Sequence, residues 1–526
     1  MSRFPVTAAG LEPVSSCLFV NFLSGDLPVQ ERSIPELQNA MTDGELTAVA
    51  LCEAYGRQID AHPEVNAIIE FNPDALTIAA GLDDERRAGK LRGPLHGIPI
   101  LLKDNIDTGD RMATTAGSLA LADSRAQQDA FVTGRLREAG AVILGKTNLS
   151  EWANFRGARS ISGWSSRGGL TRNPYALDRT ACGSSSGSGA AVAANFCAVA
   201  VGTETDGSIT CPAQTNGLVG IKPTVGLISR SGIIPISGSQ DTAGPMARTV
   251  TDAAILLGAM TGMDARDPVT ETSDGHFYTD YRPFLVADGL RGARIGVARG
   301  LAEHADPRIL AIFDEAIAVM RELGATVIDP VSIINPSRLQ QAELTVFHHE
   351  YKAGLNAYFA TLSEECPIRT IDDLICFNQE HAGEVMPYFG QEHLFAAAET
   401  TSLDDPAYLA ARKSCLRLSR DEGIDATLRA HKLDAIVSPT GGPAWVMDLV
   451  LGDGVHAWHV QSMTLPAVSG YPHITVPAGS IFGLPVGLSF YSTAWREPTL
   501  IRLAYAYEQA TQKRRPPRFL PGAELA

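Results

Sequence analysis

The sequence predicts an α/β fold, in which strands and helices alternate around a common sheet. Residues 290–300 have a strand pattern that enters from a turn, a helical stretch follows at Pro307–Leu323, and a second strand follows at Ala325–Ile328. This spacing is typical of a strand-helix-strand unit. Leu95–Leu102 is nearly all apolar and is bounded by Gly and Pro, as in a buried strand. Ala190–Val201 is a second nearly apolar run and predicts another core element.

The composition is that of a globular protein. Of the 526 residues, 45% are hydrophobic and 19% are charged, which excludes the low hydropathy and high charge of a disordered chain. The formal net charge of -16 argues against a nucleic-acid surface, because phosphate binding requires a basic stripe. No uninterrupted apolar stretch is long enough for a membrane span.

Cysteine and histidine usage indicates a reduced, cytoplasmic protein without a metal. The eight cysteines have no CxxC and no paired spacing, so we expect them to be unpaired. The twelve histidines occur without HExxH or a similar ligand spacing, so no metal site is predicted. Pro13, Ser15 and Ser16 interrupt the N-terminal apolar run, and we therefore expect no secretory signal.

Ordered structure is expected to begin with two helices. Ser33 to Glu36 is a capping box with proline in the first turn, and Thr42 to Glu45 predicts a second box that opens a helix through Ile59.

Farther on, the strand Leu95–Leu102 ends at Lys103. Most lysines lie on a solvated face, which is the ordinary interpretation of this residue. The alternative is that a lysine directly after a buried strand, in a pocket, is desolvated enough for its pKa to fall, and its neutral amine is then a usable base.

Gly140 to Thr147, GAVILGKT, fits the phosphate-loop pattern GxxxxGK[ST] letter for letter. A phosphate loop needs flexible residues between its glycines, whereas Ala141–Leu144 is a strand sequence. The preceding residues predict a helix that closes on Gly140. We therefore predict a helix, then a strand, then Lys146 on the following loop, without ATP binding.

Two glycine-bounded serine clusters flank the apolar run at Ala190–Val201. They lie at Gly183 to Gly189 and at Gly207 to Ser208. Glycine permits sharp turns that aim successive backbone N–H groups at one point, which is how an oxyanion site is built. A flexible linker is the alternative interpretation of such composition, but a linker has no reason to enclose a core segment.

The first cluster, GSSSG at 183–187, also fits GxSxG, the nucleophile elbow, with Ser185 as nucleophile. That motif requires a later acid and histidine, for which Asp434 and His473 are the available residues, although no local feature singles them out.

The second half of the chain first becomes helical and aromatic, from about Pro336 to Ala411, and then returns to strands. Core packing explains such aromatics, and a cap over an active site is the alternative. Strands are expected at Ala435–Ser438 and Ile474–Val476, and a final helix at Glu497–Thr511.

The serine clusters, LLKDN around Lys103 and the run GLVGIKPTVGLISRSGIIPISGSQDTAGPMARTVTDAA resemble the amidase signature family of Ser-Ser-Lys hydrolases. The resemblance covers nearly the whole chain and is strongest to peptide amidases, in KTNLSEWANFRG, SISGWS, CGSSSGS and TETDGSI. It implies a central mixed, twisted β-sheet covered by helices on both faces. Residues 1–29 lack a clear periodicity and are expected to be an N-terminal arm before a single domain at 30–526. The resemblance implies a helical substrate cap around 336–411 in that domain.

Residue by residue, the resemblance makes Ser208 the nucleophile, Ser184 the bridging serine and Lys103 the base. Neutral Lys103 would draw a proton from Ser184 while Ser184 draws one from Ser208, and the proton would return to the departing nitrogen. The peptide bond between Gly183 and Ser184 would be cis. The oxyanion donors would be the backbone N–H groups of four residues, Thr205, Asp206, Gly207 and Ser208.

The nucleophile turn departs from the common family pattern in two places. Asp206 replaces a glycine, and Thr210 replaces an arginine. A carboxylate at 206 is expected to repel an anionic substrate or attract an amine, and peptide amidases share it. Asn154, in EWANF, matches a peptide-amidase position that binds substrate main chain, although asparagine in such a loop is more often a turn former.

The sequence therefore predicts hydrolysis of the C-terminal amide of short peptides or amino-acid amides, by a monomer or homodimer without a cofactor. A broad aliphatic or aryl acylamidase of the same family is the alternative. A catalytically dead binding protein is disfavoured because Lys103, Ser184 and Ser208 are all present. An amidotransferase subunit is disfavoured by the acidic balance and by the TETDGSI turn.

Overall fold

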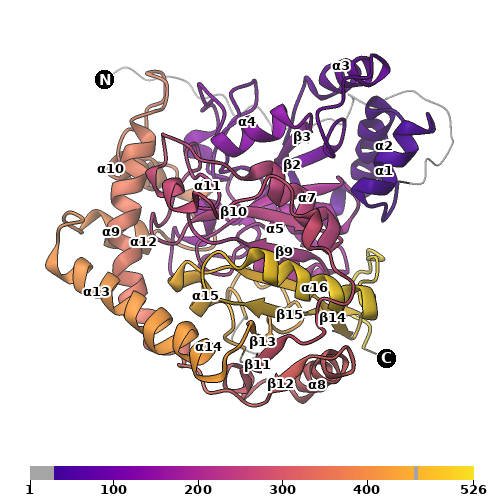
Figure 1. The fold of residues 1–526 in the computed structure, drawn as a ribbon. Helices are drawn as coiled ribbons and strands as arrows, with labels where there is room; N and C mark the ends of the chain where they lie inside the picture. Colours follow the sequence, from indigo (N-terminus) through magenta and orange to yellow (C-terminus); the bar gives the residue numbers. More distant parts are fainter. Residues whose placement is uncertain (1–28, 455–459, 526) are drawn as a thin grey trace.

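A computed structural model describes residues 29–454 and 460–525, so the predicted arm at 1–29 lies almost entirely outside the described residues. Eleven strands of the described chain form one sheet, in the order β1-β3-β2-β8-β10-β9-β14-β15-β13-β11-β12 (Figure 1). The strands are β1 (Ile68–Phe71), β2 (Pro99–Lys103), β3 (Val142–Thr147), β8 (Val199–Glu204), β9 (Val219–Lys222), β10 (Thr242–Ala247), β11 (Arg294–Val297), β12 (Thr326–Ile328), β13 (Ala435–Pro439), β14 (His473–Ile481) and β15 (Leu484–Tyr491).

The sheet is mixed, as expected. β2 is parallel to both β3 and β8, and β11 is parallel to β12 and β13. The other neighbouring pairs are antiparallel. Two short hairpins lie outside the sheet, formed by β4 (Trp164–Ser165) with β5 (Gly169–Leu170) and by β6 (Arg172–Asn173) with β7 (Ala176–Thr180).

Helices cover both faces of the sheet, so its central strands are buried on both sides, whereas the edge strands β1 and β12 are partly exposed. One face is packed by α7 (Val250–Met260), α8 (Pro307–Glu322) and α16 (Glu497–Thr511). The other face is packed by α5 (Ser186–Ala193) and α6 (Thr210–Thr215). All eight residues of α5 are buried, which agrees with the apolar run in the sequence.

Further helices lie around this core. They are α1 (Ile34–Thr42), α2 (Ala48–Ala61), α3 (Ala75–Arg87), α4 (Phe131–Glu138), α14 (Asp425–His431) and α15 (Thr464–Ser469). The capping box at Ser33 is confirmed, with reciprocal bonds between Ser33 and Glu36. The second predicted box is wrong. Thr42 ends α1, and α2 is capped by Thr47, whose side chain accepts from Ala50 N.

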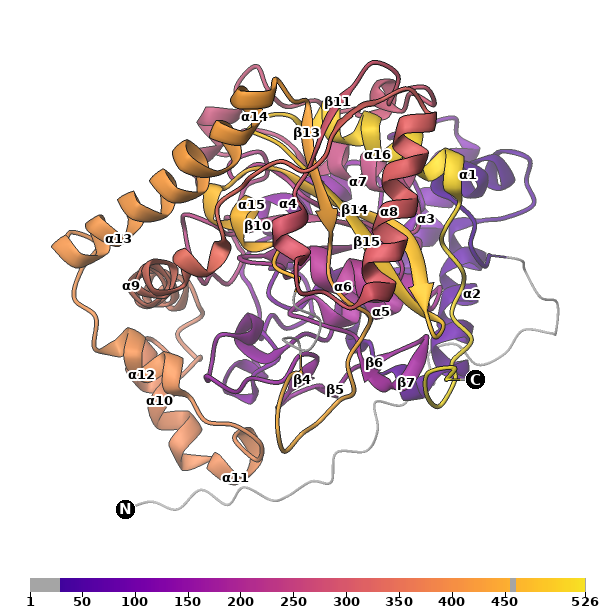
Figure 2. The same ribbon diagram turned by 90° about the horizontal axis from the view of Figure 1, so that it is seen from below.

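Residues 340–416 form a separate group of helices beside the sheet (Figure 2). They are α9 (Gln340–Phe359), α10 (Ile371–Glu380), α11 (Ala382–Val385), α12 (Glu392–Ala398) and α13 (Pro406–Leu416). Part of this group shares a hydrophobic cluster with Trp152 and Phe155, so it packs onto the main body through aromatic side chains. Its role as a substrate cap stays a prediction.

The phosphate-loop match at Gly140 to Thr147 folds as part of the sheet. Helix α4 ends at Glu138, and β3 then runs through all of Val142–Thr147, so Lys146 lies in the strand and not on the following loop as predicted. Lys146 is fully buried, and its Nζ donates to Ile106 O, Ala113 O and Thr114 Oγ1. No phosphate-binding loop is formed by this segment.

Gly145 is required for strand pairing, which generates a prediction. A Cβ added at Gly145 would lie 2.3 Å from Glu70 O on β1, whereas a Cβ at Gly134 in α4 meets nothing within 4 Å. Gly145→Ala is expected to lower the free energy of unfolding by about 1–3 kcal/mol, because β1 must move away. The matched Gly134→Ala is expected to raise it by about 0.5–1 kcal/mol. Denaturant unfolding measures both, and equal stability of the two variants would contradict this explanation.

Candidate active site

The parallel pairing of β2 and β8 places Lys103 beside Thr203. Ile100 pairs with Val199 and Leu102 pairs with Val201, so both strands end at the same edge of the sheet. Carboxyl ends of parallel strands are the usual position of sites in α/β folds. The last residue of β2 is Lys103, and Thr203 is the fifth residue of β8.

Lys103 is fully buried, and its polar neighbours are uncharged. Its Nζ lies 2.7 Å from Ser184 Oγ, 2.8 Å from Thr203 Oγ1 and 3.2 Å from Thr203 O. Burial lowers the pKa of Lys103 to about 7, against the opposing influence of the Asp241 and Glu204 charges. A substantial fraction of this amine is therefore neutral near neutral pH.

Ser184 lies two residues before α5, and the peptide bond between Gly183 and Ser184 is cis, as expected. The carbonyl of Ser184 accepts from Ser150 N at 3.1 Å. Ser184 is fully buried, and the side chain of the nearby Ser186 donates to Cys182 O. These bonds fix the first serine cluster so that the Ser184 hydroxyl faces the lysine.

Ser208 lies on the turn between β8 and α6. Ser185 N donates to Ser208 O at 3.3 Å, so the two serine clusters are in direct contact. Gly207 has φ of +77°, which favours glycine there. The backbone N–H groups of Asp206, Gly207 and Ser208 have no hydrogen-bond partner within the described chain. A row of free N–H groups is the arrangement that an oxyanion requires.

Glu204 stabilises this turn through hydrogen bonds. Its Oε2 accepts from Ile209 N at 2.8 Å and from Thr210 N at 3.0 Å. On the other side, Asp241 accepts from Thr205 Oγ1 at 2.6 Å and from the backbone N–H groups of Ile236 and Ser237. Asp241 thus uses both of its oxygens on the turn and its support, whereas Glu204 uses only Oε2, and its Oε1 is buried without a partner in the described chain. Neither carboxylate forms an ion pair with Lys103 within the described residues.

A disulfide links the two clusters and corrects the expectation that all cysteines are unpaired. Cys182, directly before Gly183, is bonded to Cys211 in α6. The two are 29 residues apart in sequence, and no local spacing reveals the pair. They meet because the serine clusters that they flank are in contact. Five other cysteines of the described chain are free, namely Cys52, Cys197, Cys366, Cys376 and Cys415.

A pocket of about 560 Å³ adjoins both serine clusters, and we call it the serine-side pocket. Its wall includes Gly183, Gly207 and Asn154. Three carboxyl groups line it, from Asp206, Glu343 and Asp453, and no Lys, Arg or His occurs among its described lining residues. Burial raises the pKa of Asp206 to about 7 and raises those of Glu343 and Asp453. The described lining therefore offers no cation to pair with an anionic group, and its carboxyl groups oppose such a group once they are ionised.

Asn154 occupies an unusual backbone segment. Trp152, Ala153 and Asn154 have φ of +51°, +53° and +74°. Left-handed backbone is common for asparagine but costs energy for the other two, and such strain clusters at functional sites. The Oδ1 atom of Asn154 is buried without a hydrogen-bond partner within the described chain. The side chain is thus available to a donor in the pocket.

The structure does not assemble the alternative elbow site. Ser185 Oγ donates to Thr203 O at 3.1 Å and accepts from Thr203 N at 3.2 Å. His473 lies in β14, where its Nε2 is 2.6 Å from Ser489 Oγ, and burial lowers its pKa to about 3. Asp434 accepts from Arg294 N at 2.9 Å. The three residues therefore have separate partners.

Residues 29–454 and 460–525 contain no group of three or more His, Cys, Asp or Glu that could hold a metal ion. No helix in that part of the chain is long and apolar enough to cross a membrane.

Comparison with known proteins identifies the family. The sequence model of the Amidase family matches residues 50–501. The chain belongs to the amidase family. It is 42% identical over 509 residues to a probable amidase of Arabidopsis thaliana, covering 95% of this chain and 93% of the relative. It is 34% identical over 493 residues to a component of the glutamyl-tRNA(Gln) amidotransferase of Alkalilimnicola ehrlichii, covering 92% of this chain and 98% of that component.

Among solved structures, this amidase is similar to the native peptide amidase of Stenotrophomonas maltophilia. The TM-score is 0.89 at 54% sequence identity, and the match covers 94% of this chain and 99% of that chain. The protein is an amide-hydrolysing enzyme with the fold of that family.

Four residues around the site of this amidase were not predicted from the sequence. They are Thr203, Glu204, Asp241 and Glu343, which contact the lysine, the turn or the pocket. Only Thr203 and Glu204 carry a sequence signal, because they end the strand before the TETDGSI turn. Asp241 and Glu343 lie far along the chain, and folding alone brings them here.

Proposed function

We propose that this amidase hydrolyses the C-terminal amide of short peptides and amino-acid amides, with Ser208 as nucleophile, Ser184 as proton shuttle and Lys103 as base. The observation that carries the proposal is the 2.7 Å contact between Lys103 Nζ and Ser184 Oγ, with both groups fully buried. A base in hydrogen-bond reach of the proton that it takes is the first requirement of such a mechanism.

The surroundings of Lys103 suit a neutral amine. A neutral Nζ has two N–H groups and one lone pair. Thr203 offers two acceptors, O and Oγ1, at 3.2 and 2.8 Å. When both N–H groups donate to Thr203, the lone pair is left for the Ser184 hydroxyl. Ser184 can then give its proton to Lys103 while it takes one from Ser208, and the nucleophile is activated.

The turn at Ser208 supplies the electrostatic stabilisation. An attacking Ser208 Oγ makes the carbonyl oxygen of the substrate an oxyanion, which the free N–H groups of Asp206, Gly207 and Ser208 can receive. One preorganised donor of this kind is worth on the order of 10² to 10³ in rate. The bond to nitrogen then breaks as Lys103 and Ser184 return the proton to it, and ammonia leaves.

The serine-side pocket favours an amide over a free acid. Within residues 29–454 and 460–525, the hydrogen-bond donors to its carboxyl groups are neutral: Gln240 Nε2 donates to Glu343, and Ser162 and Trp445 donate to Asp453. An ionised substrate carboxylate would meet like charges without a compensating cation, which is costly in a partly desolvated site. The 54% identity to a peptide amidase supports the same substrate class.

The nucleophile assignment predicts a labelling pattern. Ser208→Ala should abolish covalent labelling by a fluorophosphonate, because the attacking oxygen is removed. The matched change Ser185→Ala, in the adjoining cluster, should leave labelling measurable, since the Ser185 hydroxyl is bonded to Thr203. Intact-mass spectrometry measures both. Labelling that survives in Ser208→Ala and is lost in Ser185→Ala would instead establish the elbow site.

The substrate assignment is tested with a peptide amide and its free acid. Incubation of the amide should give only the product in which OH replaces the terminal NH₂, with no shortened fragments, by mass spectrometry. Shortened fragments, or turnover confined to anilides, would contradict the assignment and favour an acylamidase.

The free acid should inhibit weakly, and its inhibition constant should rise as pH passes about 7, the pKa to which burial raises Asp206. Burial also raises the pKa of Glu343, so this second carboxyl group adds its charge only above its ordinary range. Removing one charge by Glu343→Gln should lower that constant at alkaline pH by about tenfold, or ~1.4 kcal/mol. Glu380→Gln, on the exposed surface of α10, is the control and should leave it unchanged. Equal inhibition constants for the wild type and Glu343→Gln would show that the charge of the pocket does not cause the selectivity for amides.

A further inference from the structure

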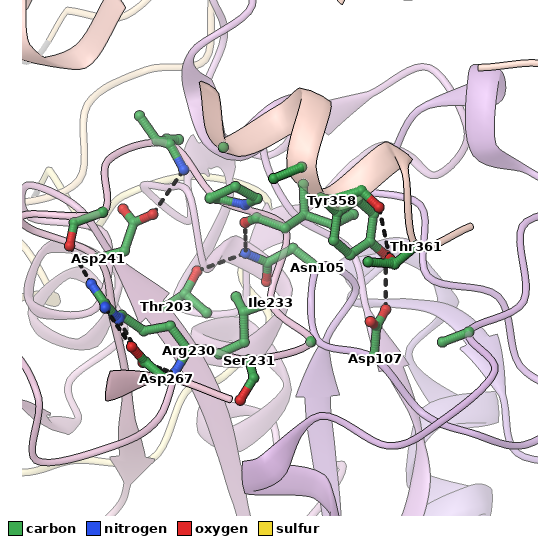
Figure 3. Close-up of a pocket in the computed structure, with 18 of the residues that line it drawn as sticks. Asn105, Asp107, Thr203, Arg230, Ser231, Ile233, Asp241, Asp267, Tyr358 and Thr361 are labelled. Carbon is green, nitrogen blue, oxygen red and sulfur yellow. Dashed lines mark hydrogen bonds and ion pairs between the residues drawn. The ribbon is translucent and has the colours of Figure 1, made fainter. Parts of the chain in front are cut away.

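A second cavity is lined by Thr203, which is hydrogen-bonded to Lys103, and we call it the lysine-side cavity. Its volume is about 730 Å³, and Asn105 and Thr203 line its inner wall (Figure 3). Thr205 also lines it. Its outer rim includes Ala357 and Thr361 beside residues 126–128, and the rim side chains at 127, 128, 357 and 361 are exposed. The cavity therefore reaches from the surface to the groups that hold the lysine.

The wall between this cavity and the serine-side pocket is one chain thick. Thr205 lines the lysine-side cavity, and the next residue, Asp206, lines the serine-side pocket. In the same way Ala153 faces one and Asn154 faces the other. The turn that carries Ser208 and the left-handed backbone at 152–154 thus separate the lysine-side cavity from the serine-side pocket.

Asn105 indicates what kind of molecule the inner end of the cavity holds. Its side chain is 2% exposed, and its Nδ2 donates to Thr203 Oγ1 at 3.0 Å, the atom that lies 2.8 Å from Lys103 Nζ. Its Oδ1 is buried and has no partner within the described chain. A buried carbonyl oxygen is normally hydrogen-bonded. A hydrogen bond from a small neutral donor, water or ammonia, would satisfy it.

The reaction requires such molecules to move during each turnover. In acylation, the bond from Ser208 Oγ to the carbonyl carbon forms, the C–N bond breaks, and the proton of Ser208 leaves on ammonia. In deacylation, a water oxygen bonds to the same carbon, the bond to Ser208 Oγ breaks, and a water proton returns to Ser208. One ammonia must leave and one water must enter while the peptidyl group fills the serine-side pocket.

We propose that the lysine-side cavity is the route by which water enters and ammonia leaves the catalytic centre while a peptide occupies the serine-side pocket. The inference rests on the proposed function for the catalytic residues. In this proposal Asn105 accepts a hydrogen bond from the water or ammonia, and Thr203 connects that position to Lys103.

The route is tested by closing its rim. The double variant Ala357→Trp/Thr361→Trp places two large side chains at the mouth. The matched control Ala353→Trp/Ala360→Trp changes exposed positions of the same segment that do not line the cavity. Acyl-enzyme is formed from p-nitrophenyl esters, whose burst of nitrophenol measures acylation even if peptide amides are not the substrates. Single-turnover kinetics then measure deacylation.

Two acyl groups are compared, a tripeptidyl group that fills the serine-side pocket and an acetyl group that leaves it open. Closing the rim should slow deacylation of the peptidyl-enzyme by about tenfold or more, and should leave the acetyl-enzyme and the control variant within about twofold. An equal effect on both acyl groups, or no effect on either, would overturn the proposal. Failure to hydrolyse peptide amides, with the acyl-group dependence retained, would instead overturn the substrate assignment.

A second measurement needs no substitution. If the open route to the peptidyl-enzyme is the lysine-side cavity, hydroxylamine should intercept the acyl group and give the hydroxamate, while benzylamine should not. With the acetyl-enzyme, both amines should react through the open serine-side pocket. Equal interception of the peptidyl-enzyme by both amines would overturn the proposal even if the rim variant fails to fold.

Discussion

Removal of one lysine from water is the constraint on which the site of this amidase depends. Lys103, Lys146 and Lys222 are all fully buried, and burial lowers the pKa of each. Their contacts differ. Lys146 Nζ donates to three oxygens, Ile106 O, Ala113 O and Thr114 Oγ1, so all its hydrogen-bonding capacity is used as an ammonium. Lys103 has two acceptors on Thr203 and one serine hydroxyl that can give a proton. The first environment holds a charge, whereas the second suits a base.

The rest of the structure maintains that environment. Parallel pairing of β2 with β8 sets Lys103 beside Thr203, and the contact between the serine clusters sets Ser184 beside the turn of Ser208. Asp241 and Glu204 lie close enough to raise the pKa of Lys103, but neither is bonded to it: both oxygens of Asp241 and Oε2 of Glu204 accept from the turn and its support. Their negative charge therefore limits the fall of the pKa without forming an ion pair that would keep the amine protonated. The Cys182–Cys211 disulfide links the two clusters, and both cysteines line the serine-side pocket.

Local sequence signals predicted the elements well, and long-range contacts account for the errors. The final helix Glu497–Thr511 and the strand-helix-strand unit around Pro307 are found where their patterns place them, because caps, periodicity and apolar runs are local. The box at Thr42 fails because Asp43, Gly44 and Glu45 turn the chain, and Thr47 offers the cap instead. The disulfide, Asp241 and Glu343 could not be predicted from spacing, since each reaches the site only through tertiary folding. Lys103, Ser184 and Ser208 were proposed from glycine-serine clusters and family resemblance, and the fold brings their segments together.

The central claim is that neutral Lys103 is the base, and the pH dependence of kcat/KM for a peptide amide tests it most directly. This ratio reports ionisations of the free enzyme. Because the base acts only when neutral, kcat/KM should be lost as pH falls through about 7, the pKa to which burial lowers Lys103. Asp206 also has its pKa raised to about 7, so the measurement is made in Asp206→Asn as well. The account predicts that the acid limb persists in that variant with a midpoint near 7. A profile that stays flat to pH 5, or a limb that disappears with Asp206, would contradict it.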